Sequence, residues 1–401
     1  MMNAPPEHRY TLILLLTLNA VSIVAMQFIV PAMPSLVSEF ATTPAMVQLT
    51  LTLFMLGYAV FQIAYGPLSD RFGRKGLLLW ATGVFVVGSF LGAVAPNIEV
   101  LILARVLQSV GAAAGFVLPP AVARDVYGHA GAPRAIGWIS ISAGIAAVIS
   151  PYIGGLVHET AGWRWGMGLN GALGIAILMA CWLFLTESHP TALRRAVGVA
   201  GLARGYAALA RSQRFIGYLL AVAFVNGTFY AFFAGGTFVA IEILSLSPSQ
   251  FGLLTMPLVL VFLPSAYLSV RMAARYGSTK IIVFGTLTTF VGSAGLLVVA
   301  LSGNVSVVAM LFASVLIGWG NGQVIPNATA AAMNLFPKLA GTASASLGTA
   351  QMGMGAVASL LFGLLHNGTS TPMAALMAGM GLLAFVSCGL IVASRQRTAP
   401  V

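Results

Sequence analysis

Long apolar runs separated by short polar segments fill the whole chain. A helix that spans a bilayer needs about 20 consecutive, mostly apolar residues, and twelve such runs can be marked. The predicted spans are 10–34, 45–67, 76–95, 98–121, 135–157, 165–186, 214–241, 249–270, 280–301, 305–330, 341–366 and 371–394. The pattern predicts an all-α membrane protein with twelve transmembrane helices.

The composition agrees with lipid as the main solvent. Of the 401 residues, 59% are hydrophobic and 7% are charged, whereas a soluble domain carries about 25% charged residues. Cys181 and Cys388 lie inside apolar runs, which predicts packing residues and no disulfide or metal site. The first run is too long for the core of a signal peptide, so we expect an uncleaved span.

The basic residues predict the orientation. With the N-terminus in the cytoplasm, every Lys and Arg falls in a cytoplasmic segment except Arg105, inside the fourth run, and Arg164, in an outer loop. The net charge of +11 then belongs to the cytoplasmic face, and no nucleic-acid partner is expected. Both termini are predicted to be cytoplasmic.

One long polar connection divides the chain. The arginine-rich segment 187–213 contains no strong apolar run, which predicts a cytoplasmic linker between six-helix bundles at 1–186 and 214–401.

The two halves look like repeats. The loop at 68–75 has a degraded copy at 270–277, and Gly111 and Gly318 each stand eight residues before a proline. These matches predict two similar bundles.

The residue types in the loop after the second span indicate which contacts it can make. It reads Gly-Pro-Leu-Ser-Asp-Arg-Phe-Gly-Arg-Lys over 66–75. Gly73 permits a tight turn, and Asp70 can accept hydrogen bonds from arginines or from free amides at a neighbouring helix N-terminus. The alternative is a solvated basic loop.

Two further stretches carry unusual residues inside spans. Arg105 stands within 101–111, and a charge there is costly unless it faces a partner or a watery cavity; the alternative is that it reaches the outer interface near Glu99. In the fifth span, Pro151 stands among small residues, which bend a helix and permit close packing.

These stretches, together with Gln27 to Pro34 in the first span, resemble the major facilitator superfamily and, within it, the drug/proton antiporters of the bicyclomycin and chloramphenicol resistance branch. The resemblance covers nearly the whole chain. It implies two pseudo-symmetric six-helix bundles in a bacterial inner membrane that export a small molecule by alternating access. It also implies coupling and gating roles for Asp70, Arg71, Arg74, Arg105, Asp125 and Pro151.

The first span departs from the family pattern. An aspartate is usual four residues before the first proline, and here that position is Gln27. All eight acidic residues are predicted at span ends or in loops, so no carboxylate is expected at the membrane midplane. Three hypotheses for coupling follow. Protons are coupled through Asp125 or Asp70 with Arg105, or through Glu242 if it lies deeper, or the protein is a uniporter or uses another ion.

Polar and aromatic residues in mid-span are the candidates for the lining of the substrate site. They are Asn19, Gln27, Tyr58, Gln62, Arg105, Gln108, Asn226, Phe229, Tyr230, Phe233, Asn321, Gln323 and Gln351. Each alone is at least as well explained by packing or by hydrogen bonds between helices. As a set they predict an uncharged pocket with one cation at its edge, suited to neutral, zwitterionic or weakly anionic amphiphiles such as phenicol-like drugs.

Other classes of protein fit less well. A membrane enzyme needs clustered His, Asp, Glu or Cys at one face, and the carboxylates here are scattered; a channel fits the two-half repeat poorly. A metabolite importer and a siderophore exporter remain open. The expected partners are a small-molecule substrate, protons and the lipid bilayer, with no cofactor, no metal and a monomeric chain.

Overall fold

The computed structural model describes residues 6–189 and 199–396, and its regular structure there is helical throughout. Within these described residues, twelve segments are long and apolar enough to cross a membrane. The predicted all-α architecture with twelve spans is therefore confirmed.

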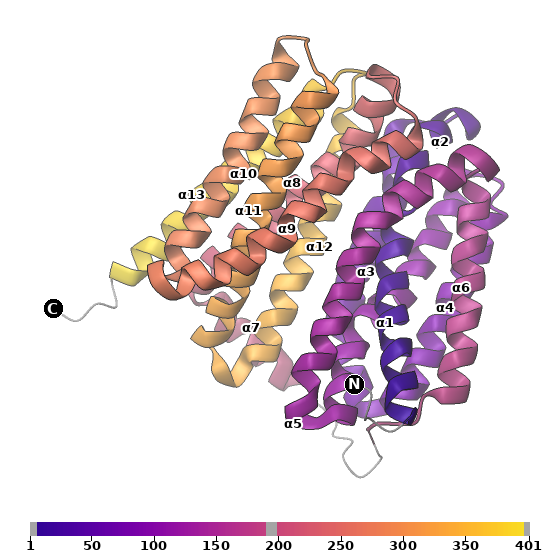
Figure 1. Cartoon of the computed structure of the whole chain (residues 1–401), viewed down its shortest axis with the longest axis vertical. Coiled ribbons are helices and arrows are strands. Elements are labelled where there is room, and N and C mark those ends of the chain that lie inside the picture. The colour runs from indigo at the N-terminus through magenta and orange to yellow at the C-terminus, as the bar shows by residue number, and fades with distance from the viewer. Residues whose placement is uncertain (1–5, 190–198, 397–401) are drawn as a thin grey trace. The chain divides into compact units, whose positions relative to one another are not determined.

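Contacts divide the chain into two compact units, coloured indigo to magenta and pink to yellow in Figure 1. The first comprises Met1–Thr42 and Leu49–Val197, and the second comprises Thr43–Gln48 and Gly198–Val401. The main division falls inside the segment 187–213, whose own bounds as a linker stay a prediction.

The first unit contains spans one to six. Its elements are α1 (Pro6–Gln27), η1 (Val30–Ala32), α2 (Met33–Glu39), α3 (Pro44–Phe72), α4 (Arg74–Ala93), α5 (Ile98–Ala161) and α6 (Trp163–Phe184). α5 holds two spans, Ile98–Gly128 and Ala130–Ala161. The break lies at Gly128, whose φ of 62° and ψ of −174° interrupt the helical backbone. The predicted end of the fourth span, at 121, is too early because the helix continues through charged residues to this glycine.

The second unit contains spans seven to twelve. Its elements are α7 (Val199–Ala210), α8 (Gln213–Phe238), the π-helix η3 (Val239–Ile243), α9 (Pro248–Tyr276), α10 (Ser278–Leu301), α11 (Val307–Leu335), η4 (Pro337–Leu339), α12 (Ala340–Leu365) and α13 (Thr371–Gln396). α9 runs obliquely to its neighbour α11 (Figure 1). The first residues of α3 belong to this unit, where Ser359 donates to the Gln48 side chain at 2.8 Å.

Part of the segment between the sixth and seventh spans, Val199–Ala210, forms a helix that its polarity did not predict. Its helix α7 lies in the sequence predicted as a plain linker. Leu209 is buried in the core of the second unit together with Phe215 and Tyr218. A connecting segment thus contributes to the packing of the C-terminal spans.

Glycines let the helices of each unit approach closely. A Cβ at Gly111 would stand 2.5 Å from the Ala81 carbonyl oxygen of α4, and a Cβ at Gly320 would stand 2.5 Å from the Gly285 carbonyl oxygen of α10. Gly318 instead meets α9. Packing therefore pairs Gly111 with Gly320, and the predicted pairing with Gly318 is wrong by two residues.

Candidate functional site

The first span breaks where its two prolines begin. α1 ends at Gln27, a short 3-10 helix covers Val30–Ala32, and α2 starts at Met33. Pro31 has no N–H to continue the α-helical pattern. The last carbonyl groups of α1 therefore need donors from outside their own helix.

Arg105 supplies those donors. Its Nη1 donates to the Ala25 carbonyl and to Gln108 Oε1, both at 2.7 Å, and its Nη2 lies 3.4 Å from the Met26 carbonyl. The guanidinium lies 4.2 Å from the centre of the Phe54 ring. The side chain is fully buried, so it does not reach the interface near the exposed Glu99. A cation at a helix C-terminus also meets the negative end of the helix dipole.

The small residues of the fifth span pack on the same break. Ser150 Oγ donates to Gln27 Oε1 at 2.9 Å. A Cβ on Gly154 would stand 2.3 Å from the Phe28 carbonyl oxygen, so only glycine fits there. Pro151, a predicted gating residue, is buried between these two positions. Ser150 and Gly154, small residues singled out in the sequence, thus pack directly on the bent first span.

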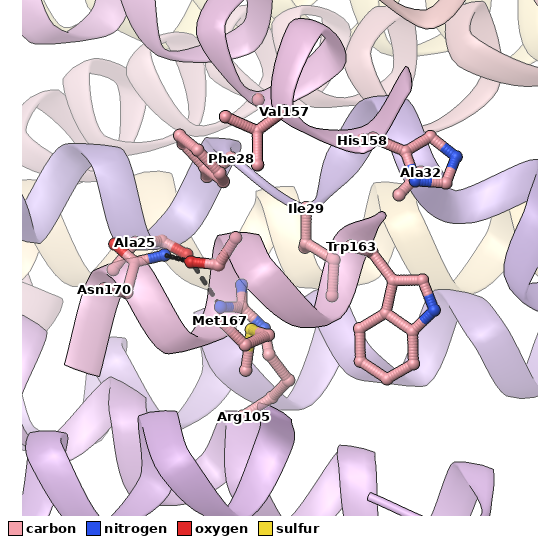
Figure 2. Close-up of a pocket in the computed structure, with 12 residues that line it drawn as sticks. Ala25, Phe28, Ile29, Ala32, Arg105, Val157, His158, Trp163, Met167 and Asn170 are labelled. Carbon is pink, nitrogen blue, oxygen red and sulfur yellow. Dashed lines mark hydrogen bonds between the residues drawn. The ribbon is translucent and has the colours of Figure 1, made fainter. Parts of the chain in front are cut away.

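A small cavity lies beside this break. Figure 2 shows Arg105 at one margin, His158 at another and Asn170 beside the Ala25 turn. Its free volume of about 10 Å³ leaves room for a single water molecule. A drug-sized ligand needs roughly 300 Å³ or more, so this cavity is no substrate pocket.

The remaining predicted lining residues of the first unit are polar groups at helix contacts. Gln108 Nε2 donates to Ser89 Oγ at 2.8 Å. Tyr58 is buried, with its ring centre 6.0 Å from that of Phe116. Asn19 Oδ1 and Gln62 Oε1 are buried without a hydrogen-bond partner. Arg105 and Gln108 therefore belong to one polar network with Ser89, and Gln27 pairs separately with Ser150.

In the second unit the predicted aromatic residues form one group. Phe229 stacks on Phe233 at 4.8 Å and meets the edge of Tyr230 at 5.1 Å between ring centres. Asn226 Nδ2 donates to the Gln351 carbonyl at 3.0 Å. The three aromatic residues thus pack on one another along α8, and the Asn226–Gln351 bond joins α8 to α12.

Two amides of α11 offer unused acceptors. Asn321 Nδ2 donates to the Ile317 carbonyl at 3.1 Å, which leaves its buried Oδ1 without a partner. Gln323 Oε1 is likewise buried and unpartnered. Unused buried acceptors are costly, so they mark positions where a hydrogen-bond donor would be favoured.

The charged loop after the second span forms a compact cluster inside the first unit. Arg74 pairs with Asp70 at 2.8 Å and with Asp125 at 3.1 Å, and it also donates to Ser69. Arg71 is exposed and lies over the Phe72 ring. The structure thus joins three of the predicted gating residues and leaves Arg71 outside.

Sequence analysis missed Glu187 in this cluster. Its carboxylate accepts from the backbone N–H of Arg74 at 2.9 Å and from that of Lys75 at 3.3 Å, the first amides of α4. Of the two kinds of partner predicted for Asp70, arginines and free helix amides, it has an arginine, Arg74, and Glu187 binds the helix amides. In the sequence, Glu187 is a single acidic residue at the start of the polar connection, and it stands 113 positions after its partner Arg74.

Among the described residues whose burial is known, no carboxylate side chain is buried. Glu242 lies in the terminal π-turn of the seventh span with its side chain 41% exposed. The alternative that placed Glu242 deep in the span is therefore wrong.

The sequence profile of the Major Facilitator Superfamily matches residues 15–359. The chain belongs to this superfamily. Its relatives include Multidrug resistance protein D of Escherichia coli K12, 29% identical over 96% of both chains. Chloramphenicol resistance protein of Pseudomonas aeruginosa is 28% identical over 90% of this chain and 86% of its own. A bicyclomycin resistance protein homolog of Haemophilus influenzae is 25% identical over 92% and 93%.

A solved structure of similar fold is an auto-inhibited peptide transporter of the POT family. It is 15% identical, has a TM-score of 0.77 and covers 98% of both chains. The family and its relatives make this protein a multi-pass membrane transporter of small molecules and not an enzyme. The predicted resemblance to the drug-resistance branch is thereby confirmed.

Proposed function

We propose that the protein is a secondary active exporter of neutral or zwitterionic amphiphilic molecules that exchanges its substrate for protons by alternating access. The observation that carries this proposal is its similarity, over about nine-tenths of the chain, to relatives named for resistance to chloramphenicol, bicyclomycin and multiple drugs. Weakly anionic substrates fit the same chemistry.

The charge of the candidate site supports this substrate class. The buried cation, Arg105, is already occupied by the carbonyls of Ala25 and Met26 and by Gln108. No carboxylate of known burial in the described parts of the chain lies in the interior. A lipophilic cation would therefore find no counter-charge there, whereas unpaired amide oxygens suit uncharged donors.

The proposal includes an orientation and roles for the predicted residues. The Asp70 cluster faces the cytoplasm of a bacterium, as do both termini, because the basic residues gather on that side. The buried polar and aromatic residues line the substrate path of a monomer, and Asp70, Arg74 and Asp125 gate its cytoplasmic end.

Uniport is the second candidate, and a specific observation favours it. Gln27 stands where the family pattern has an aspartate, and an amide does not titrate. Its Oε1 is engaged by Ser150. A transporter without a titrating midplane group can still move its substrate down a gradient.

Transport by the purified protein in liposomes separates these two candidates, with chloramphenicol as the probe. Exchange of one proton for one neutral molecule supports about tenfold accumulation per unit of pH gradient. We expect accumulation that collapses when a protonophore is added. Chloramphenicol movement without proton movement would instead establish uniport.

A charge placed at the break of the first span tests the substrate class. We expect Gln27→Asp to add export of ethidium, a lipophilic cation, because the new carboxylate supplies a counter-charge. Gln27→Asn is the matched control, since it shortens the side chain without adding charge. Susceptibility of cells that express each variant gives the measurement, and strong ethidium export by the unmodified protein would contradict the proposed class.

A further inference from the structure

Three buried polar atoms with unused hydrogen-bonding capacity belong to side chains around the cavity beside the broken first span. Arg105 Nε, His158 Nδ1 and Asn170 Oδ1 have no hydrogen-bond partner within the described residues. All three side chains line this cavity (Figure 2), and every residue of its lining belongs to the first unit. Most buried polar atoms in proteins have a partner, so three exceptions around one space indicate a site for a polar ligand.

The amide of Asn170 has a defined orientation. Its Nδ2 donates to the Gly166 carbonyl of its own helix at 3.1 Å. A carbonyl oxygen only accepts hydrogen bonds, so the nitrogen of the amide, and not its oxygen, must face it. The side chain is 2% exposed, and its Oδ1 is left as a buried acceptor. A ligand that satisfies Asn170 therefore has to donate a hydrogen.

The other two atoms set different requirements. The hydrogen bonds of Arg105 to the backbone of α1 and to Gln108 all come from Nη1 and Nη2. Its Nε carries a hydrogen and can only donate. His158 Nε2 lies 3.0 Å from Ser35 Oγ, a contact that either neutral tautomer of the ring can make. His158 Nδ1 is therefore a donor in one tautomer and an acceptor in the other.

Water meets all of these requirements. It accepts from Arg105 Nε, donates to Asn170 Oδ1 and suits His158 Nδ1 in either tautomer. An anion would leave Asn170 without a donor, and a cation would be repelled by the guanidinium. The free volume of about 10 Å³ admits one water molecule and no larger ligand.

We propose that this cavity is a binding site for a structural water molecule, held between Arg105 Nε and Asn170 Oδ1, with His158 as a further polar group of its lining. A charge inside a span is costly unless it has partners or water. The carbonyls of α1 engage the Nη atoms of Arg105, and the water engages Nε. The same water links Arg105 of α5 to Asn170 of α6. The site concerns the first unit alone and is independent of antiport.

X-ray radiolysis of the purified protein in detergent measures the hydration of a buried cavity. X-rays split water into hydroxyl radicals, and a radical formed inside the cavity oxidises a neighbouring methionine to the sulfoxide. Met167 lines the cavity and is 2% exposed, which shields it from radicals of the bulk solvent. Met373, fully buried in the second unit and packed against Gly235, is the reference. We expect Met167 to be oxidised several-fold faster than Met373.

A leucine variant tests the assignment of Asn170. Asn170→Leu keeps the approximate size of the side chain and removes the acceptor, so the oxidation rate of Met167 should fall to that of Met373. Asn321→Leu is the matched control. Asn321 also donates from Nδ2 to the carbonyl four residues earlier in its own helix, and its Oδ1 also lacks a partner in the described parts of the chain. This variant should leave the oxidation rate of Met167 unchanged.

Two results would overturn the inference. One is oxidation of Met167 no faster than that of Met373 in the unmodified protein, and the other is an unchanged rate at Met167 in Asn170→Leu. Should Asn170→Leu not fold, an experimental density map of the unmodified protein that shows ordered waters decides, and a map without a water bonded to Arg105 Nε would contradict the proposal. Failure here leaves the proposed antiport intact, because chloramphenicol accumulation is measured separately.

Discussion

The loops after the second and eighth spans share a backbone and differ in chemistry. Gly73 has φ 92° and ψ 162°, and Gly277 has φ 85° and ψ 140°. Three residues before each glycine stand Asp70 and Ala274, so the second loop has no acid at the place where the first has one. The turn is therefore a requirement of the fold, whereas the ion pairs are a property of the first unit alone, which is where a role in gating has to be sought.

The interiors of the two units also differ in charge, with the buried charge again in the first unit. Six residues before Gly111 stands Arg105, and six before its packing counterpart Gly320 stands Ser314. Ser314 is also fully buried, but its hydroxyl donates to the Leu311 carbonyl of its own helix at 2.8 Å. In the first unit a buried charge thus binds the broken end of the first span. In the second unit α8 continues directly into the π-turn η3, so no such break has to be bound.

The largest effect is expected from Arg105→Ala. The change removes the bonds that Arg105 donates to the Ala25 and Met26 carbonyls and to Gln108 Oε1, and loss of a buried charged partner costs about 3 kcal/mol or more. Chloramphenicol accumulation should fall to background and thermal unfolding in detergent should occur earlier. Ser314→Ala, the matched change, should cost at most about 1 kcal/mol; equal losses in both variants would mean that the two units do not differ as described.

Most of the fold could be predicted because the bilayer leaves few choices. Twelve apolar runs of spanning length give the helices, and the turn at Gly73 repeats at Gly277 with the same local sequence cue. Prolines misled the alignment of the repeats: Pro119 and Pro326 suggested the pairing of Gly111 with Gly318, but helix packing follows the glycine faces. Local sequence does not reveal which face of a helix meets its neighbour.

The candidate site was predictable in its members but not in its contacts. A buried arginine in a span is conspicuous in any sequence, and Arg105 is indeed fully buried. That it binds the carbonyls of a helix end, and not a carboxylate, depends on how α1 and α5 pack. Glu187 was missed for the same reason, since its partner amides lie across the unit.

The next largest effect concerns the shared turn. Residues other than glycine at these φ and ψ values cost about 1–3 kcal/mol. Gly73→Ala and Gly277→Ala should therefore destabilise the protein by similar amounts in thermal unfolding. Transport should suffer more from Gly73→Ala, because that turn also positions Arg74 within the ion-pair cluster. Equal transport by the two variants would argue against a gating role for the cluster.

A smaller effect is expected from the ion pairs themselves. Asp125→Asn removes the negative charge that pairs with Arg74 Nε, and the Asp125 side chain is 23% exposed, so the loss is about 1 kcal/mol. Asp70→Asn should cost less, because the Asp70 side chain is 41% exposed. Transport rates measured at low and high salt check this order, since screening weakens exposed pairs most. A larger effect at Asp70 would mean that its role does not come from pairing with Arg74.

The smallest effect is expected from the negative charge at the start of a helix. Removing this charge in one half and adding one at the equivalent helix of the other half tests whether its role is purely structural. Glu187→Gln weakens the acceptor of the first amides of α4 and should cost about 0.5–1 kcal/mol. α10, the equivalent helix, begins at Ser278 with no acidic residue in its first turn. Ser278→Asp should therefore stabilise the second unit by roughly 0.5 kcal/mol. In the double variant the two changes should offset one another in thermal unfolding, because they lie in separate units and share no partner. If the double variant regains stability but not transport, Glu187 has a role in gating as well as in capping α4. A charge with a purely structural role could be compensated by a stabilising change in the other unit.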